Sequence, residues 1–271
     1  MKSQFAQKTV IITGSSMGIG KVLALNLAKL GANVVINARS VDKLRATETE
    51  MKEMGLEVLA IVGDITLESD CRRLIDGAVA RFGRIDILIN NAGISMRGSV
   101  ETLTPQVIAK VFNCNAVAPY MLSTMAMPFI KQNKGSVVFI STLAALRGLP
   151  YLSVYGSAKM ALKGLAESLR IEHLGDNIHV GLIYIGITKI DQNKTALASN
   201  GETINLDRRD GLFAKSIEDV AKNIVRNIVL RKQTTIIGVS GKVYYFMVRF
   251  MPLVLSLIIK YSHKRLKKLY S

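Results

Sequence analysis

Tyr155 and Lys159 stand four residues apart in a segment, 154–174, whose apolar spacing predicts a helix. On a helix, side chains at this spacing share one face. A phenol ordinarily titrates near ~10, so it is a poor proton donor or acceptor at neutral pH. A neighbouring ammonium favours the phenolate, and Lys159 would therefore adapt Tyr155 to general acid–base work. The alternative is a solvated surface pair, which is the usual meaning of this spacing in isolation.

A second candidate group is a glycine-rich loop, Thr13-Gly14-Ser15-Ser16-Met17-Gly18-Ile19-Gly20, between an apolar run and a predicted helix. Gly14 permits a sharp turn, Gly18 lets the backbone approach a pyrophosphate, and Gly20 permits close helix–strand packing. The amino terminus of the helix then offers unpaired N–H groups to an anion. We expect dinucleotide binding here, and the alternative is an ordinary glycine-rich turn.

These groups need a scaffold, and apolar runs rich in Val and Ile alternate with segments of helical period. The predicted strands are Thr9–Ile12, Asn33–Ile36, Val58–Val62, Ile85–Ile89, Val137–Ile140, Ile178–Ile183 and Thr235–Ile237. The predicted helices are Lys21–Leu30, Asp42–Met54, Ser69–Phe82, Pro105–Ile130, Val154–Leu174 and Ser216–Leu230. Continuous apolar strands are buried on both faces, which indicates a parallel sheet. The alternation predicts a doubly wound α/β domain.

Glycines and one polar segment mark the connections. Gly31, Gly55, Gly83 and Gly175 directly follow four predicted helices, where a left-handed residue suits the helix end. Thr188–Arg209 is polar and mostly aperiodic, so we expect a loop that contacts the substrate.

The spacing of Gly14, Gly18 and Gly20 resembles that of the short-chain dehydrogenase/reductase family, and other motifs agree with it. Asn90-Asn91-Ala92-Gly93 follows the fourth predicted strand, Tyr155-Gly156-Ser157-Ala158-Lys159 matches the family's Tyr-x-x-x-Lys, and Asn115 matches its helix asparagine. The resemblance covers residues 8 to about 240. It implies a single Rossmann-fold domain, residues 1–240, that transfers a hydride between a nicotinamide and a carbonyl or secondary alcohol.

The resemblance implies roles for the catalytic residues. Tyr155 would protonate the carbonyl oxygen, Lys159 would tune Tyr155 and hold the nicotinamide ribose, and Asn115 would orient a water that connects Lys159 to solvent. The family has a serine thirteen residues before the tyrosine, and this chain has Thr142 there. Threonine keeps the hydroxyl but is stiffer at χ1, so Thr142 would polarise the substrate oxygen. Ser141 would substitute if the register shifted.

The resemblance also bears on the cofactor. Family members that select NAD carry an acid where Ala38 stands, and the chain follows Ala38 with Arg39 and Ser40. Arginine suits a phosphate through its fork of donors, so we predict NADP(H). The remaining cofactor contacts implied by the resemblance are Asp64, Ile65, Asn91, Ala92, Gly93, Gly186, Ile187 and Thr188. Ile185 stands where the family usually has proline, which leaves the last of these loops less constrained.

Composition excludes several classes of protein. The chain has 271 residues, of which 49% are hydrophobic, so disorder is excluded. Two cysteines and three histidines provide neither a disulfide framework nor a Cys/His zinc cluster, and we expect no metal. The formal net charge is +16, yet the first 219 residues hold 25 basic and 20 acidic residues, a net charge of +5. The rest of the excess lies in the last 52 residues, which contain no acid.

The tail, residues 241–271, combines this charge with apolar residues. Val243–Ile259 is 17 residues long and apolar except for Arg249 and Ser256, which is short for a membrane span and contains Pro252. Counted as one helix, Arg249, Ser256, Lys260, His263 and Lys267 fall near one stripe beside a broad apolar face. We predict that Val243–Lys268 lies in a membrane interface, with Lys264–Lys268 attracted to anionic head groups and a helix break at Pro252. A single span and burial against a partner subunit are the alternatives.

These observations predict an NADP(H)-dependent oxidoreductase that is cytoplasmic and peripheral on a membrane, with no secretory leader. Its substrate would be hydrophobic, such as a keto-lipid or a sterol, as in the membrane-associated lipid and steroid branches of the family. The basic residues alternate with aliphatics, so nucleic-acid binding is not expected. Two other hypotheses stay open: an NADP(H)-binding sensor or scaffold with little catalysis, suggested by Thr142 and Ile185, and a soluble homo-oligomeric reductase of small ketones.

Overall fold

The computed structural model describes residues 2–189, 195–206 and 214–270, without the side chains of Lys2 and of residues 263–270. Parts of the predicted substrate loop Thr188–Arg209 therefore lie outside the described residues. The same holds for the side chains of His263 and of the basic cluster Lys264–Lys268.

The central sheet has seven parallel strands in the order β10-β7-β6-β4-β1-β2-β3. Their bounds are β1 (Thr9–Thr13), β2 (Asn33–Ala38), β3 (Val58–Val62), β4 (Ile87–Asn90), β6 (Ser136–Thr142), β7 (His179–Ile185) and β10 (Thr234–Ile236). The chain runs outward from β1 to β3, then returns to β4 and continues to the opposite edge. The strand order reverses between β1 and β4, and ligands of such sheets bind at this point, outside the carboxyl ends of the strands.

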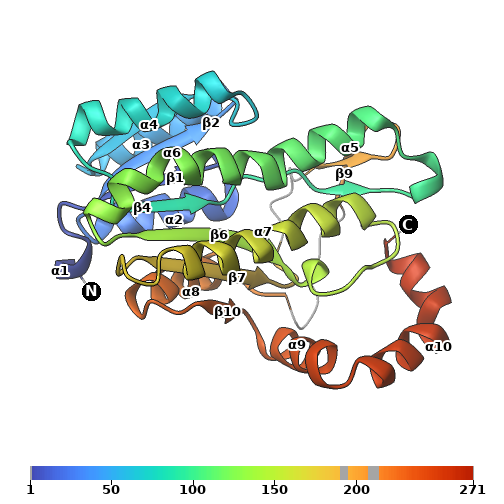
Figure 1. Ribbon diagram of the computed structural model, residues 1–271. Coiled ribbons are helices and arrows are strands. Elements are labelled where there is room, and N and C mark those ends of the chain that lie inside the picture. The colour runs from blue at the N-terminus through green and yellow to red at the C-terminus, as the bar shows by residue number, and fades with distance from the viewer. Residues whose placement is uncertain (1, 190–194, 207–213, 271) are drawn as a thin grey trace.

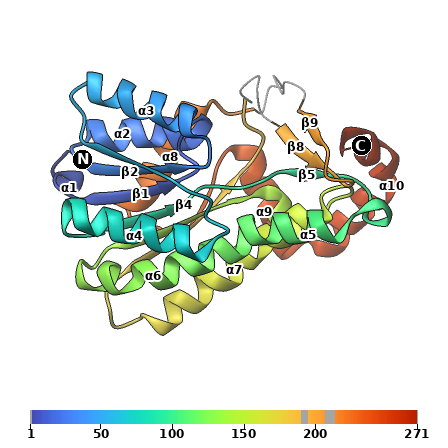
Figure 2. The same cartoon turned by 90° about the horizontal axis from the view of Figure 1, so that it is seen from above.

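Two layers of helices cover the sheet (Figures 1 and 2). One face packs against α2 (Gly18–Lys29), α3 (Val41–Glu53) and α8 (Ile217–Val229). The other face packs against α4 (Glu68–Phe82), α6 (Ala118–Gln132) and α7 (Ser153–Glu172). Short elements complete this part of the chain: α1 (Lys2–Phe5), η1 (Val100–Thr102), α5 (Pro105–Phe112) and η3 (Leu143–Ala145). Every residue of β1 and β7 is buried, because helices cover both faces of the sheet at these strands.

The doubly wound α/β prediction is confirmed, with each predicted strand and helix found near its expected bounds. The long helix predicted at Pro105–Ile130 is interrupted by a π-helical turn at Asn113–Val117, between α5 and α6. Gly31, Gly55 and Gly83 have positive φ after their helices, as expected. The prediction for Gly175 was wrong, since the left-handed residue after α7 is Asn177, with φ 53°. Asparagine tolerates this conformation because its side chain bonds locally.

A small second sheet lies beside the first and was not predicted. It consists of β5 (Met96–Arg97), β8 (Thr195–Ala198) and β9 (Thr203–Asn205), in that order. Two of these strands, β8 and β9, fall within Thr188–Arg209, so the described part of the expected substrate loop contains strand structure that was not predicted. Strands of two to four residues are too short to show an alternating pattern in the sequence.

The tail folds as two helices, α9 (Val239–Phe250) and α10 (Pro252–Tyr270). The predicted break at Pro252 is confirmed, because the axes of α9 and of 252–262 differ by 114° at Met251. The single polar stripe was wrong, since Arg249 and Ser256 stand on different helices. No single helix among the described residues is long and apolar enough to cross a membrane, although this bent pair passes the same test on length and composition.

Candidate active site

A cavity of about 1490 Å³ opens at the carboxyl ends of the central strands. Every predicted cofactor residue except Ser15 lines it, as do Thr142, Tyr155 and Lys159. The residues therefore come from the ends of β1, β2, β4, β6 and β7 and from α7, and the sheet brings them together at its topological switch point. Asn115 lies outside this lining, directly behind it.

The glycine loop has the geometry that its sequence predicts. Gly14 has φ +63°, and a Cβ there would lie 2.8 Å from the Cα of Ala92. A Cβ on Gly20 would lie 2.3 Å from the Gly14 carbonyl oxygen, so only glycine permits the helix to start this close to the strand. Gly18 opens α2 with φ +56° and has nothing within 4 Å of a Cβ. This loop leaves room for an anion at the amino terminus of α2.

Ser15 and Asn91 hold this loop in place. The buried Ser15 hydroxyl donates to the Ile12 carbonyl at 2.7 Å and accepts from the Asn37 N–H at 2.9 Å. The Asn91 amide donates to the carbonyls of Thr13 and Gly14 at 2.9 and 3.0 Å. Both side chains thus bond to the backbone of the neighbouring strand ends, and the loop conformation is fixed before any ligand binds.

One end of the cavity carries positive charge. Arg39 follows β2, is exposed, and lies 3.6 Å from a carboxylate oxygen of Asp64. Burial opposes ionisation of Asp64, but hydrogen bonds from Thr66 and the charge of Arg39 outweigh it and lower the pKa of this carboxyl. Ser40 is the N-cap residue of α3. Lys43, one turn further along α3, also lines the cavity and was not singled out from the sequence.

Lys159 lies deep in the cavity wall, 5% exposed, and its Nζ donates to the Ile140 carbonyl at 3.0 Å. Gly93 lies close to both Lys159 and Asn115, and a side chain there would crowd them. A Cβ on Gly93 would lie 3.1 Å from Lys159 Nζ and 3.0 Å from Asn115 Oδ1. Burying an ammonium is costly unless polar groups or an anion accompany it. Tyr155 stands one turn earlier on α7, so the buried ammonium and the phenol share one face of this helix.

Asn115 is fully buried in the π-helical turn. Its Oδ1 accepts from the Ile94 N–H and its Nδ2 donates to the Ile94 carbonyl, both at 2.8 Å. Single π turns inside α-helices are rare and are frequent at functional sites. The side chain therefore fixes the chain after Gly93, and the predicted role of Asn115 in orienting a water stays a prediction.

Ser141 and Thr142, at the end of β6, both line the cavity, but their hydroxyls make different hydrogen bonds. Ser141 Oγ is buried and donates to the Lys159 carbonyl at 3.2 Å, so it ties β6 to α7. Thr142, the last residue of β6, lines the cavity, and its Oγ1 accepts from the Ala144 N–H at 3.3 Å. The hydroxyl proton of Thr142 is therefore available to a substrate oxygen, which is the role predicted for it.

The loop after β7 also lines the cavity, next to the end of β6. Gly186, Ile187 and Thr188 line the cavity, and Lys215 pairs with this loop through backbone bonds to Ile187 and Lys189 at 3.0 and 2.9 Å. This pairing holds the loop even though Ile185 replaces the proline of the family pattern.

Helices α9 and α10 form one wall of the cavity, the far wall, and no sequence pattern predicted this. Tyr244 on α9 and Leu255, Ile258, Ile259 and Ser262 on α10 line the same cavity as Tyr155. They lie about a hundred residues beyond the motifs, and their apolar pattern was interpreted as a membrane surface, a membrane span or a subunit interface, but not as part of the active site. Among the described residues, no group of three or more His, Cys, Asp or Glu side chains is placed to hold a metal ion.

The family model described as "short chain dehydrogenase" matches residues 8–201. This chain is a member of the short-chain dehydrogenase family. A relative, 11-beta-hydroxysteroid dehydrogenase-like 4A of Arabidopsis thaliana, is 31% identical over 223 residues, which cover 82% of this chain and 73% of the relative. Another, 11-beta-hydroxysteroid dehydrogenase A of Sesamum indicum, is 30% identical over 264 residues, 94% of this chain and 75% of that protein.

Solved structures agree with the short-chain dehydrogenase fold. A metagenomic short-chain oxidoreductase in complex with NADP matches with a TM-score of 0.70 and 26% identity, over 86% of this chain and 97% of that one. An alcohol dehydrogenase from the archaeon Thermococcus sibiricus, complexed with 5-hydroxy-NADP, matches with a TM-score of 0.75. Its 21% identity, over 85% of this chain and 96% of that one, supports the fold alone. The chain is thus an oxidoreductase of this family.

Proposed function

We propose that the protein is an NADP(H)-dependent oxidoreductase that interconverts a carbonyl and a secondary alcohol on a hydrophobic substrate. The observation that carries the proposal is the shared cavity. Tyr155, Lys159 and Thr142 line the same cavity as the glycine loop and the apolar residues of α9 and α10. A cofactor and an apolar substrate would therefore meet at the same hydroxyl groups.

The charge beside β2 supports NADP(H). Arg39 is exposed, Lys43 lies on the same cavity wall, and Ala38 provides no carboxylate that would repel a 2′-phosphate. Asp64 is paired with Arg39, so its charge is compensated. The metagenomic short-chain oxidoreductase that this chain resembles was solved with NADP, which agrees with the proposal.

The chain's own residues divide the reaction between them. Tyr155 donates a proton to the carbonyl oxygen, and Thr142 Oγ1 hydrogen-bonds the same oxygen and polarises it. The buried ammonium of Lys159 stabilises the phenolate that the proton transfer leaves behind. When bound, the nicotinamide supplies the hydride that reduces the carbonyl carbon. The relatives named as hydroxysteroid dehydrogenases make a sterol-like or other lipid-like ketone a reasonable first substrate class.

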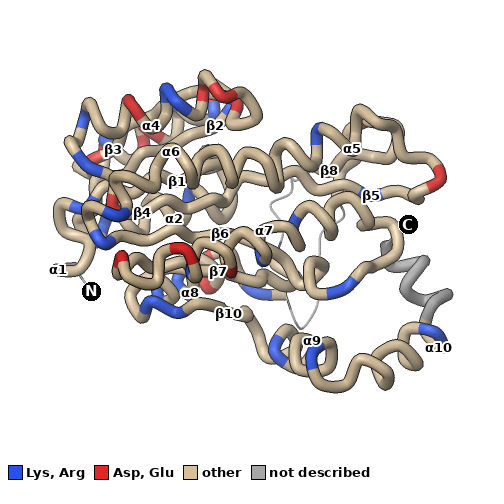
Figure 3. The backbone as a smooth tube through the Cα atoms, in the orientation of Figure 1, with Lys and Arg blue, Asp and Glu red and all other residues tan. Residues whose placement is uncertain are grey.

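The outer face of the tail supports attachment to a membrane surface. Phe246, Phe250, Leu253, Leu257 and Tyr261 are all more than half exposed, and Leu253 and Tyr261 are above 80%. The charged residues described on α9 and α10 are all basic (Figure 3). Exposed apolar residues combined with positive charge are typical of helices that lie in a membrane interface.

Product analysis tests the catalytic proposal. Full-length protein in detergent is incubated with NADPH or NADH and a panel of keto-lipids, sterols and small ketones, and products are identified by mass spectrometry. We expect reduction of hydrophobic ketones with NADPH preferred. NADPH binding without any turnover, unchanged in Thr142→Ser, would instead indicate the sensor hypothesis.

Flotation with vesicles tests the membrane proposal. Full-length protein should float with vesicles that contain anionic lipid, and the double variant Leu253→Glu, Tyr261→Glu should float much less. The matched control is Val100→Glu, since Val100 is also exposed but lies in η1. Equal flotation of all three proteins would exclude the outer face as the contact surface.

A further inference from the structure

Helix α10 has two apolar faces, and they differ in what they contact. Leu255 is 5% exposed, and Ile259 and Ser262 follow it at helical spacing and are half-buried. Leu253, Leu257 and Tyr261 form the opposite, exposed face. A helix whose only function is to lie on a membrane needs a single apolar face. The inner face therefore needs an explanation of its own.

The inner face is part of the catalytic cavity. Leu255, Ile258, Ile259 and Ser262 line the cavity that contains Tyr155, and Tyr244 of α9 joins them. From Leu255 to Ser262 the wall extends about 10 Å along the helix axis. Leu149, Leu152, Leu197 and Leu206 also line the cavity. Among the described lining residues the one carboxylate is Asp64, which lies beside Arg39 at the cofactor end.

Arg147 fixes α10 in this position. Its Nη2 donates to Ser256 Oγ at 2.9 Å, and its Nη1 donates to the Pro252 carbonyl at 3.4 Å. Arg147 follows η3, which begins directly after Thr142. One short segment thus carries both the hydroxyl that would polarise the substrate oxygen and the guanidinium that holds the far wall. The distance between the reacting carbonyl and α10 is set locally.

We propose that the inner face of α10 selects the substrate, by binding an apolar tail that extends from the carbonyl being reduced. This inference rests on the proposed function and adds the part of the substrate that is recognised. The wall offers apolar side chains, the ring of Tyr244 and the hydroxyl of Ser262, with no described charge, so it suits a hydrocarbon chain or an apolar ring system. Arg147 acts as a positioning residue, since it touches α10 and not the reacting atoms.

Burial of hydrocarbon sets the size of the expected selectivity. Each methylene that leaves water for an apolar wall strengthens binding about fourfold. The kcat/KM of straight-chain methyl ketones should therefore rise by about this factor per methylene over the part of the tail that reaches α10. Ketones too short to reach the wall should show no such rise.

A matched pair of tryptophan variants tests the proposal, because the chain contains no tryptophan. Ile259→Trp fills the inner face, and Leu253→Trp places the same side chain on the outer face of the same helix. With NADPH in detergent, Ile259→Trp should lower the ratio of kcat/KM for tetradecanone over butanone at least about tenfold. Leu253→Trp should leave the ratio as it is in the wild type. Unchanged ratios in both variants, or equal losses for both ketones in Ile259→Trp, would overturn the inference.

The same variants report binding without turnover. Decanone should shift the indole emission of Ile259→Trp, and should leave the emission of Leu253→Trp unchanged. If no ketone is reduced by the wild type but this difference in emission persists, the proposed reaction fails and the apolar subsite stands. If ketones are reduced and the two emissions respond alike, the subsite fails and the reaction stands.

Arg147→Met tests how the wall is held. Loss of both hydrogen bonds frees α10, so the rise of kcat/KM with chain length should flatten by at least about threefold per pair of methylenes. Arg147→Lys keeps a cation and one donor and should restore part of the rise. An unaltered chain-length dependence in Arg147→Met would show that Arg147 does not position the wall.

Discussion

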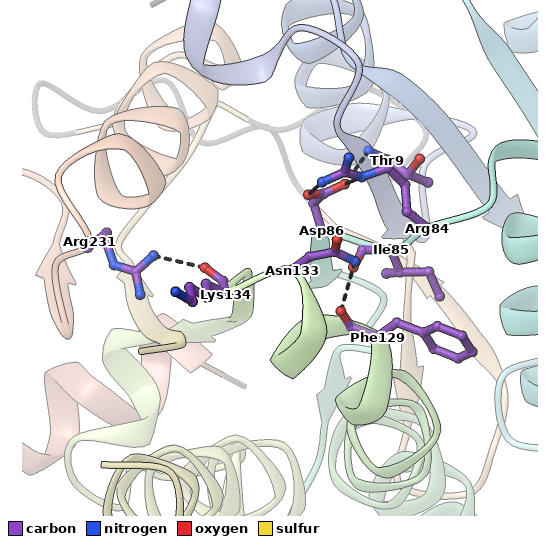
Figure 4. A network of polar contacts seen from close by, with 8 residues as sticks. All are labelled: Thr9, Arg84, Ile85, Asp86, Phe129, Asn133, Lys134 and Arg231. Carbon is purple, nitrogen blue, oxygen red and sulfur yellow. Dashed lines mark hydrogen bonds and ion pairs between the residues drawn. The ribbon is translucent and has the colours of Figure 1, made fainter. Parts of the chain in front are cut away.

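The two ends of the central sheet use polar residues in opposite ways. At the amino ends, Asp86 is buried and accepts two hydrogen bonds from Arg84, at 2.6 and 2.7 Å, and one from the Thr9 N–H at 2.9 Å (Figure 4). Asn133 bridges the carbonyls of Ile85 and Phe129 nearby. At the carboxyl ends, Arg39 and the hydroxyls of Thr142 and Tyr155 line a cavity.

This difference between the two ends of the sheet indicates that polar residues at the amino ends serve stability and those at the carboxyl ends serve the reaction. Polar groups that satisfy one another lower the free energy of the folded state, and they offer nothing to a ligand. Polar groups that face a cavity contribute less to folding and remain available for binding. Substitutions at the amino ends should therefore change stability and spare turnover, and those at the carboxyl ends should do the reverse. The following predictions test this separation, from the largest expected effect to the smallest.

Tyr155→Phe should have the largest effect, because it removes the proton donor and little else. We expect kcat to fall by about a thousandfold, as is usual when a general acid is lost. NADPH affinity and the urea midpoint should stay near wild-type values, as measured by fluorescence titration and by circular dichroism. Turnover within tenfold of wild type would refute the assigned role.

Asp86→Ala should destabilise the fold by about 3 kcal/mol, since it leaves the Thr9 N–H without its acceptor and removes the hydrogen bonds from the partly exposed Arg84. Urea unfolding measures this loss, and kcat of the folded enzyme should be unchanged. Glu68→Ala is the control, because its ion pair with Arg72 is exposed and should contribute no more than about 0.5 kcal/mol. A large loss of kcat in Asp86→Ala at unchanged stability would contradict the separation.

His179, the first residue of β7, should make stability depend on pH. Burial lowers the pKa of His179 from 6.5 to about 4, and the nearby charges of Arg231 and Arg170 act in the same direction. Between these values the unfolded chain binds a proton that the folded chain does not. The free energy of unfolding should therefore fall by about 2–3 kcal/mol as the pH decreases from 6.5 to 4.

Urea unfolding across this pH range measures the effect. His179→Gln removes the titrating group, so its stability should fall less steeply with decreasing pH. His173, which pairs with Asp176 at 2.7 Å, provides the comparison variant His173→Gln. Parallel pH profiles for wild type and His179→Gln would exclude His179 as the source of the slope.

Arg39→Ala should have the smallest effect and act on cofactor choice alone. Loss of one charge-assisted contact weakens NADPH binding about thirtyfold, and NADH, which lacks the 2′-phosphate, should bind nearly as before. Titration with both cofactors measures the change in preference. If both affinities fell equally, Arg39 would act on the loop conformation and not on the 2′-phosphate.

The sequence was sufficient for the parts of this protein that local patterns encode. Seven apolar runs became the seven parallel strands, because a strand buried on both faces needs continuous apolar residues. The glycines of the phosphate loop were identified from spacing, since only glycine fits at Gly14 and Gly20. The break at Pro252 followed from the missing N–H of proline.

Local sequence patterns did not predict the structure where a side chain could equally contact the membrane, solvent or the rest of the protein. An apolar face on α10 looks the same whether it meets lipid or the protein's own cavity, because the hydrophobic effect has no direction. Counting α9 and α10 as one helix placed Ser256 on a polar stripe, whereas in the structure its hydroxyl accepts a hydrogen bond from Arg147, a contact that a helix count does not contain. The strands β5, β8 and β9 are short and form only because they pair with each other.

The sequence by itself therefore determined the α/β architecture, the phosphate loop and the pair of Tyr155 and Lys159, since each depends on residues close together in the chain. Ser141 and Thr142 both line the cavity, and only the tertiary structure decided that the Ser141 hydroxyl donates to the Lys159 carbonyl while the Thr142 hydroxyl accepts from the Ala144 N–H, because these bonds depend on how β6 packs against α7. It alone decided that α10 forms a wall of the same cavity, through contacts between residues 109 positions apart. Contacts of that range leave no periodic trace in a sequence.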